Sequence, residues 1–424
     1  MKLTGKKLTL YSIIFCFIIA LLTFGGGDKY FYLFWGVTIF ISFVYLLSIM
    51  NQGKIKRNYA ELFLMLTMWM IYELVVTPWA TNPDEHLKIL LLTFLYTIFS
   101  IICAIYIGGT NNRFIKSIEV AIMVWIIINL IALLLNFIGI INYQGRSFSG
   151  VYFNRNTLAT TGLLFLVFII FLKAELIFLK ADFCFGIILL SLIILILSTL
   201  SSKGLIGIIF ISVVYLAFLK GLKRLIRVSI TIFGSFLILF LILDLDITSR
   251  VKENISGFIG INQASEPGFV SASGKERNFL MNEGFAVAMK NPLTGIGVNN
   301  SKYHLFPESY YRRLAKGQNP ESGMVSHNNY VEMLLNGGIP AFILYYFPII
   351  YIIMLLFIKN RSTELTTNNL RKYFMVSIFV KLVMDVGMVN YMNFPYIFII
   401  ASSYIFYYNH FKIKPIAKEL DKYN

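Results

Sequence analysis

Apolar stretches long enough to cross a membrane recur along almost the whole chain. A spanning helix needs about 20 mostly apolar residues, because it must cross the hydrocarbon core while bonding its own backbone groups. About twelve windows meet this requirement, in a sequence with 58% hydrophobic and 14% charged residues. We therefore expect an all-α polytopic membrane protein. The expected spans are Leu8–Phe24, Phe31–Met50, Ala60–Val76, Leu87–Ile107, Ile118–Ile138, Thr157–Leu172, Phe183–Leu200, Gly204–Leu219, Val228–Leu243, Ile339–Ile358, Tyr373–Val389 and Phe394–Tyr408.

One long polar stretch interrupts these windows. It divides the chain into residues 1–243 with nine spans, a large loop at 244–337, and residues 338–424 with three spans and a tail. Within the loop, Glu276–Lys290 places apolar residues at loosely helical spacing, which predicts a short helix against the membrane surface. Gly295-Ile296-Gly297 favours a tight turn over a phosphate cradle, because no strand precedes it and a third glycine is lacking.

Lysine and arginine gather in alternate loops. Seven loop or terminal segments hold 22 of the 37 basic residues, whereas the stretch from Asp244 to Glu332 balances nine basic residues with nine acidic ones. Because loops near the spans keep positive charge on the cytoplasmic side, both termini are expected there and the large loop on the outer face. This bias also explains the formal charge of +16, so no nucleic acid is expected as a partner.

Cysteine and histidine form no metal-binding pattern. The three cysteines, Cys16, Cys103 and Cys184, all fall inside expected spans, and the four histidines are scattered without paired spacing. A metal site or a disulfide framework is therefore not expected, and no cofactor is expected either.

His327 is the first candidate for chemistry. It precedes the apolar run Tyr330–Leu335, so it is expected near the start of a helix at the outer membrane surface. A neutral imidazole is a suitable general base near pH 7. The alternative is a histidine that only caps the helix or lies on the surface. Cationic groups on the same face, among them Arg277, favour the functional interpretation.

Lys203 is the second candidate. It lies in Ser201-Ser202-Lys203-Gly204, a very short polar hinge between two apolar helices. A charge so close to hydrocarbon is costly, and a lysine on the outer side opposes the positive-inside bias. A functional cation is therefore favoured over a lysine that only anchors the helix at the interface.

Further polar side chains are candidates for substrate binding. Arginine presents a fork of donors to phosphate or carboxylate, and asparagine suits sugar hydroxyls. The alternative for the stretch before Asn156 is a polar cap on the helix that begins there. Glu61, Glu73, Lys381 and Asp385 lie within expected spans, but Lys381 and Asp385 are four residues apart and are expected to pair. The binding candidates are Arg146, Asn154, Arg155, Asn156, Arg312, Arg313 and Asn328.

Three motifs, taken in order, resemble a known family. They are Gly150–Asn156 ahead of a span, Arg277 followed by Pro292–Gly297, and His327-Asn328 with Gly338 ten residues after Asn328. Together with the expected spans and the single large loop, they are similar to the O-antigen ligase and polysaccharide polymerase superfamily. The chain departs from that pattern at Ser202-Lys203-Gly204, where members commonly carry Ser-Arg-Gly, and at Ala341, where a different residue is usual.

The resemblance implies a GT-C-like membrane glycosyltransferase in the cytoplasmic membrane of a bacterium. It implies transfer of a glycan from a polyprenyl diphosphate carrier to a sugar hydroxyl on the outer face, without a nucleotide sugar or a metal. His327 would act as the base, oriented by Asn328, and Arg277 and Lys203 would stabilise the leaving diphosphate. Arg146 and Arg155 would hold the diphosphate or an acidic sugar. Membrane lipid, a flippase and a chain-length regulator are the further partners implied.

The acceptor is the question that the motifs leave open. A polymerase joins lipid-linked repeat units, whereas a ligase moves finished polymer to a lipid A core or another acceptor. A sequence rich in Lys, Ile and Asn is typical of an AT-rich genome, compatible with capsule-forming bacteria that lack lipopolysaccharide, and it favours the polymerase. A transporter of lipid-linked glycan is the third reading, and it would predict internal repeats and functional charges at the bilayer midplane.

Overall fold

The computed structural model describes a bundle of helices. Within the described residues no strand occurs. The described residues are 17–18, 57–140, 148–152, 154–199, 201–218, 271–306, 324–358, 364–389, 391 and 393–412. Nearly all of the expected span Leu8–Phe24, together with Phe31–Met50 and Val228–Leu243, lies outside them.

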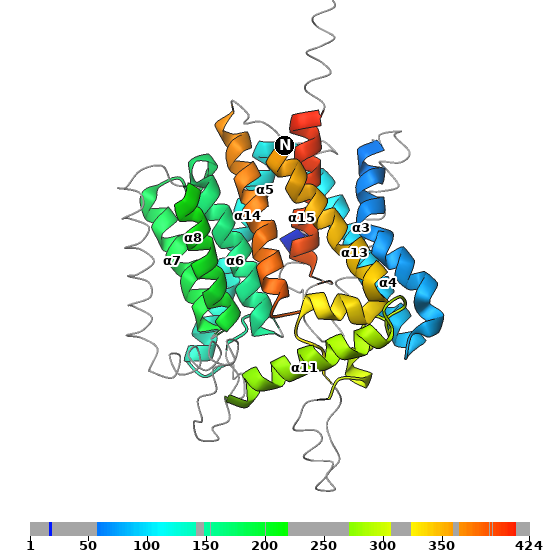
Figure 1. The fold of residues 1–424 in the computed structure, drawn as a ribbon. Coiled ribbons are helices and arrows are strands. Elements are labelled where there is room, and N and C mark those ends of the chain that lie inside the picture. The colour runs from blue at the N-terminus through cyan, green and yellow to red at the C-terminus, as the bar shows by residue number, and fades with distance from the viewer. Residues whose placement is uncertain are drawn as a thin grey trace, which may run out of the picture.

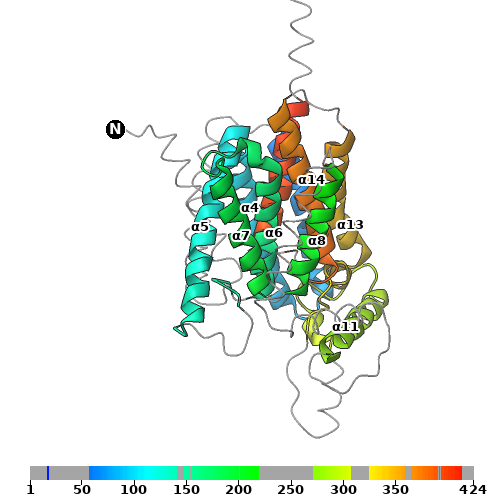
Figure 2. The same cartoon turned by 90° about the vertical axis from the view of Figure 1, so that its left-hand side faces the viewer.

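Nine of the expected spans correspond to described helices of the bundle, and α11 lies across one end of it (Figures 1 and 2). Two short 3-10 turns follow helices: η1 (Thr77–Trp79) comes after α3 and η2 (Lys173–Glu175) after α6. A third, η3 (Ser301–Tyr303), lies between α11 and α13. The helices are α3 (Arg57–Val76), α4 (Pro83–Ile107), α5 (Asn111–Phe137), α6 (Arg155–Leu172), α7 (Asp182–Ser198), α8 (Ser202–Phe218), α11 (Ser271–Lys290), α13 (Asn329–Ile358), α14 (Leu365–Asp385) and α15 (Phe394–Tyr407).

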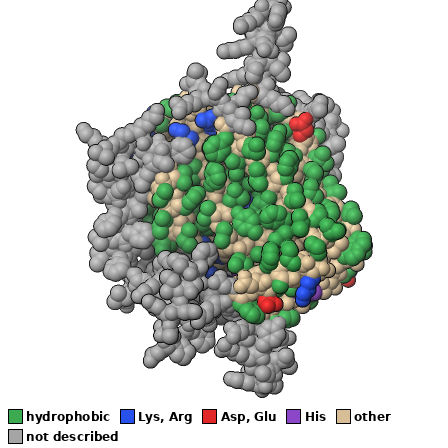
Figure 3. Space-filling model, in the orientation of Figure 1, with side chains coloured by type: hydrophobic (Ala, Val, Ile, Leu, Met, Phe, Trp, Pro, Cys, Tyr) green, Lys and Arg blue, Asp and Glu red, His purple; other side chains and the backbone are tan. Residues whose placement is uncertain are grey.

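Five of these helices are long and apolar enough to cross a membrane, namely α3, α4, α5, α6 and α13, and α7 and α8 are shorter apolar helices. Figure 3 shows one face covered by apolar side chains, with most of its charged side chains toward the two ends. An all-helical membrane protein is thus confirmed for the described part of the chain. The number of twelve spans and the GT-C-like arrangement stay predictions.

Several helices begin earlier than their apolar windows. Asn82 caps α4 by accepting a hydrogen bond from the Glu85 amide, and Thr110 caps α5 in the same way through the Arg113 amide. Such caps satisfy donors that the first turn leaves free. Polar first turns therefore extend the helices by one or two turns before the apolar part begins.

The bundle is organised around α6, which packs against α7, α8 and α14 (Figure 2). Nearly every side chain of α6 from Thr157 to Leu172 is buried. On another side, α4 packs against α15 and α3 packs against α13. The expected pair of Lys381 and Asp385 is confirmed, because their side chains form a buried ion pair on α14.

A break at Gly337-Gly338 divides α13 into a short first part, Asn329–Asn336, and a long second part. The first part lies across the end of the bundle beside α11, and the second runs along it (Figure 1). Gly338 has φ 71°, a left-handed conformation that glycine adopts readily. A Cβ on Gly337 would lie 2.4 Å from Glu73 Oε1 on α3, so this side of the break has no room for a larger residue.

The break leaves backbone carbonyls without helical donors, and the turn after α11 supplies them. The Ile296 amide donates to the Leu335 carbonyl at 2.7 Å, and the Gly297 amide donates to the Asn336 carbonyl at 2.8 Å. In return, the Ile339 amide donates to the Pro292 carbonyl at 2.7 Å. The glycine pair of this turn thus joins α11 to α13, and its amides are engaged by protein carbonyls, which agrees with the tight turn expected from the sequence.

Candidate active site

The hinge between α7 and α8 places Lys203 at the end of the bundle that carries α11. The Ser201 hydroxyl donates to the amide oxygen of Asn156 at 2.8 Å, which ties the hinge to the start of α6. Gly204 allows close helix packing, since a Cβ there would lie 2.9 Å from Cγ2 of Ile196. Lys203 is 8% exposed, and a Cβ on Gly387 would lie 3.2 Å from its Cε.

Arg277 lies on α11, whose packing face fits against the first part of α13. Leu280 and Ala288 join Val331 and Leu335 in a small apolar cluster. A Cβ on Gly284 would lie 2.8 Å from Val331 Cγ1, so the two helices approach closely there. This packing fixes the position of α11 and therefore of Arg277, which is partly buried. Burial lowers the pKa of Arg277 from its usual range, but a guanidinium keeps its charge in proteins.

His327 directly precedes the residue that caps α13. The Asn328 side-chain oxygen accepts hydrogen bonds from the Tyr330 amide at 2.9 Å and the Val331 amide at 3.2 Å. The backbone of His327 has φ 56°, in the left-handed region that side chains rarely adopt. Such a conformation costs free energy and persists where its surroundings enforce it, often at functional sites.

Electrostatic interactions connect the three candidate catalytic residues. Burial lowers the pKa of His327 to about 4, and the positive charges of Arg277 and then Lys203 contribute to the shift. Arg277 and Arg155 both lie close enough to Lys203 to act on its charge. The structure thus brings together residues from α8, α11 and the start of α13, which lie far apart in the sequence, and it adds Arg155 from the start of α6.

Lys203 and Arg277 have no counter-charge among the described residues. Within the ranges that the structure describes, Lys203, Arg277 and His327 form no hydrogen bond or ion pair. The imidazole therefore lies within electrostatic range of a lysine and an arginine that no described acid neutralises. An arrangement of this kind suits an anion, with a proton acceptor next to it.

The other binding candidates differ in what they contact. The Asn154 side chain caps α6 by accepting from the Asn156 amide at 2.8 Å, and the Asn156 oxygen accepts from Ser201. The Asn328 amide group contacts the sulfur of Met281 at 3.4 Å. The described hydrogen bonds of these three asparagines are thus structural, and none joins Asn328 to the ring of His327. Arg146, Arg312 and Arg313 lie outside the described residues.

Glu332 is a residue of the site that the sequence interpretation did not single out. Its buried carboxyl group accepts from the Ser301 hydroxyl at 2.6 Å and from the Ser326 hydroxyl at 2.7 Å and amide at 3.1 Å. The only signal in the sequence is an acidic residue inside the apolar run Tyr330–Leu335. A buried acid needs hydrogen-bond partners, and that need could have identified it.

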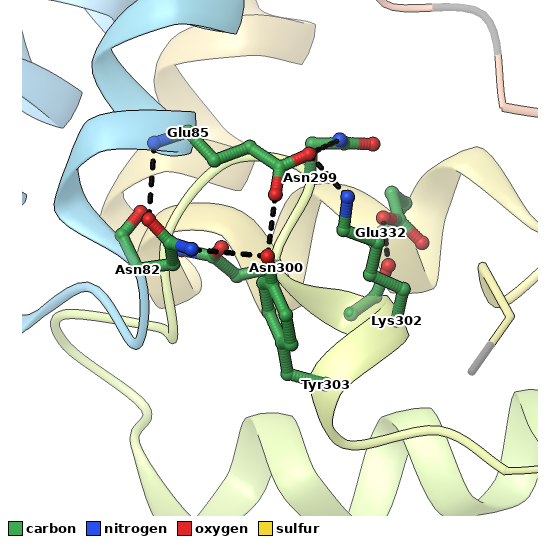
Figure 4. A network of polar contacts seen from close by, with 8 residues as sticks. Asn82, Glu85, Asn299, Asn300, Lys302, Tyr303 and Glu332 are labelled. Atoms are coloured by element: carbon green, nitrogen blue, oxygen red, sulfur yellow. Dashed lines mark hydrogen bonds and ion pairs between the residues drawn. The ribbon is translucent and has the colours of Figure 1, made fainter. Parts of the chain in front are cut away.

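A second polar network lies beside Glu332 and ties η3 to the start of α4 (Figure 4). Glu85 accepts hydrogen bonds from Asn299 at 2.8 Å and Tyr303 at 2.6 Å, and it forms an ion pair with Lys302. His86 extends this attachment, because its Nδ1 accepts from the Val298 amide at 2.7 Å. The segment after α11 is therefore held by both α4 and α13. Among the described residues, no three His, Cys, Asp or Glu side chains could hold a metal ion.

Residues 186–346 match a protein-family model described as O-antigen ligase. The matched range includes Lys203, Arg277, His327 and the break at Gly337-Gly338. A search of curated proteins gives no match to the chain. The match confirms, for this part of the chain, the resemblance found in the motifs.

Proposed function

We propose that the protein is a polysaccharide polymerase of the cytoplasmic membrane. It transfers a glycan from a polyprenyl diphosphate carrier to a sugar hydroxyl of another lipid-linked repeat unit. The reaction takes place on the outer face, with both termini of the chain on the cytoplasmic side. One observation carries the proposal: a histidine with a lowered pKa lies within electrostatic range of a buried lysine and a partly buried arginine for which the described residues provide no acidic partner. Membrane lipid, a flippase and a chain-length regulator are the further partners of this proposal.

The chemistry follows from the roles of the three side chains. His327 accepts the proton of the acceptor hydroxyl, and the oxygen attacks the anomeric carbon of the donor sugar. A new glycosidic bond forms as the bond between the sugar and the diphosphate breaks. The leaving diphosphate takes the bonding electron pair, and Lys203 and Arg277 stabilise its negative charge in the place where other enzymes use a divalent ion. Arg155 adds positive charge at the same place.

The donor also adjusts the base. Without an anion, Arg277 and Lys203 help to keep the pKa of His327 low, at about 4, and a base this weak takes a proton poorly at neutral pH. A diphosphate bound to the two cations offsets their positive field and raises the pKa of His327. His327 is therefore a stronger base when the donor is in place than when the site is empty.

A ligase is the second candidate, and the description of the matching family as O-antigen ligase favours it. Both reactions use the same donor and the same three side chains, so they differ only in the acceptor. The composition rich in Lys, Ile and Asn is the reason to place the polymerase first. Purified protein offered one lipid-linked donor and either a second lipid-linked repeat unit or a lipid A core distinguishes the two by the product formed.

The decisive test replaces the base. In a purified assay with a lipid-linked repeat unit and excess chelator, His327→Ala should lower turnover by about 10²–10⁴-fold, with little change in donor affinity. Arg277→Ala should lower both turnover and donor affinity, because the charge of Arg277 contacts the diphosphate before and during bond cleavage. Arg277→Lys should recover only part, since the fork of donors is lost.

Two results would contradict the proposal. Wild-type rate and polymer length in a correctly inserted His327→Ala protein would remove the mechanism and leave glycan binding or transport as the better explanation. Turnover that chelator abolishes and magnesium or manganese restores would show that a metal, and not these side chains, stabilises the diphosphate.

A further inference from the structure

The peptide segment that carries His327 is held from one side by a single buried acid. Glu332 lies one turn into α13 and is fully buried. Its Oε2 accepts from the amide of Ser326 at 3.1 Å and from the Ser326 hydroxyl at 2.7 Å. Its Oε1 accepts from the Ser301 hydroxyl at 2.6 Å. Ser301 belongs to η3, which is tied to the start of α4 (Figure 4). One carboxyl group thus joins the residue before His327 to a separate part of the fold.

These contacts act on the backbone of His327. Ser326 is fixed at its amide and its hydroxyl, and the hydroxyl also lies 2.9 Å from the Asn328 carbonyl oxygen. On the other side, the Asn328 side chain caps α13. His327 is therefore fixed at both neighbours, and between them its backbone takes φ 56°. A left-handed conformation of a residue with a side chain costs free energy, and it persists where the surrounding structure enforces it.

We propose that Glu332 is a positioning residue for the base, and that it acts through Ser326 to keep the imidazole of His327 beside Arg277 and Lys203. The inference rests on the proposed function, in which His327 removes the acceptor proton. Glu332 itself contacts no reacting atom. Without it, Ser326 loses two of its bonds, the backbone at His327 relaxes to an ordinary conformation, and the ring moves away from the two cations.

The chemistry of the contact distinguishes two replacements. In Glu332→Gln, the amide oxygen can face Ser326 and accept both of its donors, and the amide nitrogen can donate to the Ser301 hydroxyl, which rotates to accept. The bonds are preserved in number. In Glu332→Leu, all three donors lose their acceptor. We therefore expect turnover within about fivefold of wild type for Glu332→Gln and a loss of about 10²-fold for Glu332→Leu, with donor affinity unchanged in both.

The test is a double-mutant cycle on full-length protein. If Glu332 acts only through His327, Glu332→Leu should cause no further loss in the His327→Ala background. Ser326→Ala, a smaller change that keeps the core intact, should lower turnover by about tenfold in the wild-type background and not at all in the His327→Ala background. Glu61→Gln is the matched control, because Glu61 is an acid on α3 that accepts from Tyr404 at 2.9 Å and lies outside the site. It should leave turnover unchanged.

A second readout does not depend on activity. The rate at which diethyl pyrocarbonate modifies each histidine, measured by mass spectrometry, reports how well His327 is protected. Glu332→Leu and Ser326→Ala should both raise modification of His327 by about tenfold, whereas His410, in the π-helical turn η4 (Tyr408–Lys412) that follows α15, should react as in wild type.

The outcomes separate the two proposals. Unchanged modification of His327 in both variants overturns the positioning role, as does an additive loss of turnover in the His327→Ala background. Full activity of His327→Ala combined with raised modification of His327 in Glu332→Leu would overturn the proposed function and leave the structural link from Glu332 to His327 in place.

Discussion

Two lysines are buried within the part of the chain that the structure describes, and their surroundings are opposite. Lys381 is 1% exposed and forms an ion pair with Asp385 one turn later on α14. Its ammonium group also lies 5.1 Å from the ring centre of Tyr345. Lys203 is 8% exposed, and the charged groups that act on it are two arginines, Arg155 and Arg277.

The difference separates a charge that is satisfied within the protein from one for which the described residues provide no acidic partner. The oxygen of Asp385 that holds Lys381 also accepts from Tyr346 at 3.0 Å and from Asn329 at 3.4 Å, so the pair belongs to a complete network. A buried charge with such partners is satisfied within the protein. A buried cation among other cations is costly, and a bound anion offsets that cost. The sequence predicts the pair of Lys381 and favours a functional cation at Lys203, and the structure adds the neighbours that distinguish the two environments.

The largest expected effect is at the uncompensated lysine. Lys203→Ala should lower kcat/KM by about 10²–10³-fold, because the proposed reaction loses a cation that stabilises the leaving diphosphate. Lys203→Arg should retain activity within about tenfold, since members of the family that the motifs resemble commonly carry arginine at this position. Thermal unfolding of Lys203→Ala should show no loss of stability, because the replacement removes a buried charge without stranding a partner. A clear loss of stability in Lys203→Ala would mean that this lysine is structural as well.

The compensated lysine should show the reverse pattern. Lys381→Met leaves Asp385 buried without its cation and should reduce the free energy of unfolding by about 3 kcal/mol. Turnover per folded molecule should fall much less than in Lys203→Ala. Adding Asp385→Asn, which removes the stranded charge and keeps the oxygen that Tyr346 contacts, should restore part of the stability. Chemical unfolding in detergent measures the stability of the single and the double variant. Equal stability of Lys381→Met and wild type would contradict the distinction.

The smallest effect lies in the pH dependence. His327 has a lowered pKa of about 4 in the absence of donor, so its imidazole is neutral above that pH and activity is lost as the pH falls through it. The profile of kcat/KM, which reports the free enzyme, should therefore fall near pH 4. The profile of kcat should fall at a higher pH, because bound diphosphate offsets the charges of Arg277 and Lys203. Coincident acid limbs would show that the donor leaves the base unaffected.

Much of the helical framework is predictable from local pattern. Apolar windows located most of the bundle helices, the spacing within Glu276–Lys290 indicated the helix that became α11, and the four-residue spacing of Lys381 and Asp385 predicted their pair. The starts of helices were less predictable. Polar first turns that follow a cap, as at Asn82, carry no apolar signal and were placed outside the spans.

The candidate site depends on contacts that leave no periodic pattern. The motifs named Lys203, Arg277 and His327, but their meeting comes from the packing of α8, α11 and the start of α13. The proposed role of Glu332 rests on hydrogen bonds from two serines. Ser301 is distant in sequence, and Ser326 lies across the turn at His327. The glycine turn fits into a helix break through backbone bonds, which any sequence with the right conformational freedom could form. Such long-range pairings follow from the fold, and a single sequence does not reveal them.

The break in α13 determines how far His327 lies from the membrane-crossing part of that helix. Were the helix continuous, the eight residues Asn329–Asn336 would rise about 12 Å along the axis of the membrane-crossing part, and His327 would stand well beyond the end of the bundle. The break turns this part across the end of the bundle (Figure 1). His327 therefore stays close to the end of the bundle, where in the proposed reaction the diphosphate of a membrane-anchored carrier would reach it. In the proposed reaction, a glycan that extends outward can then grow to any length while the reacting bond stays at the same height.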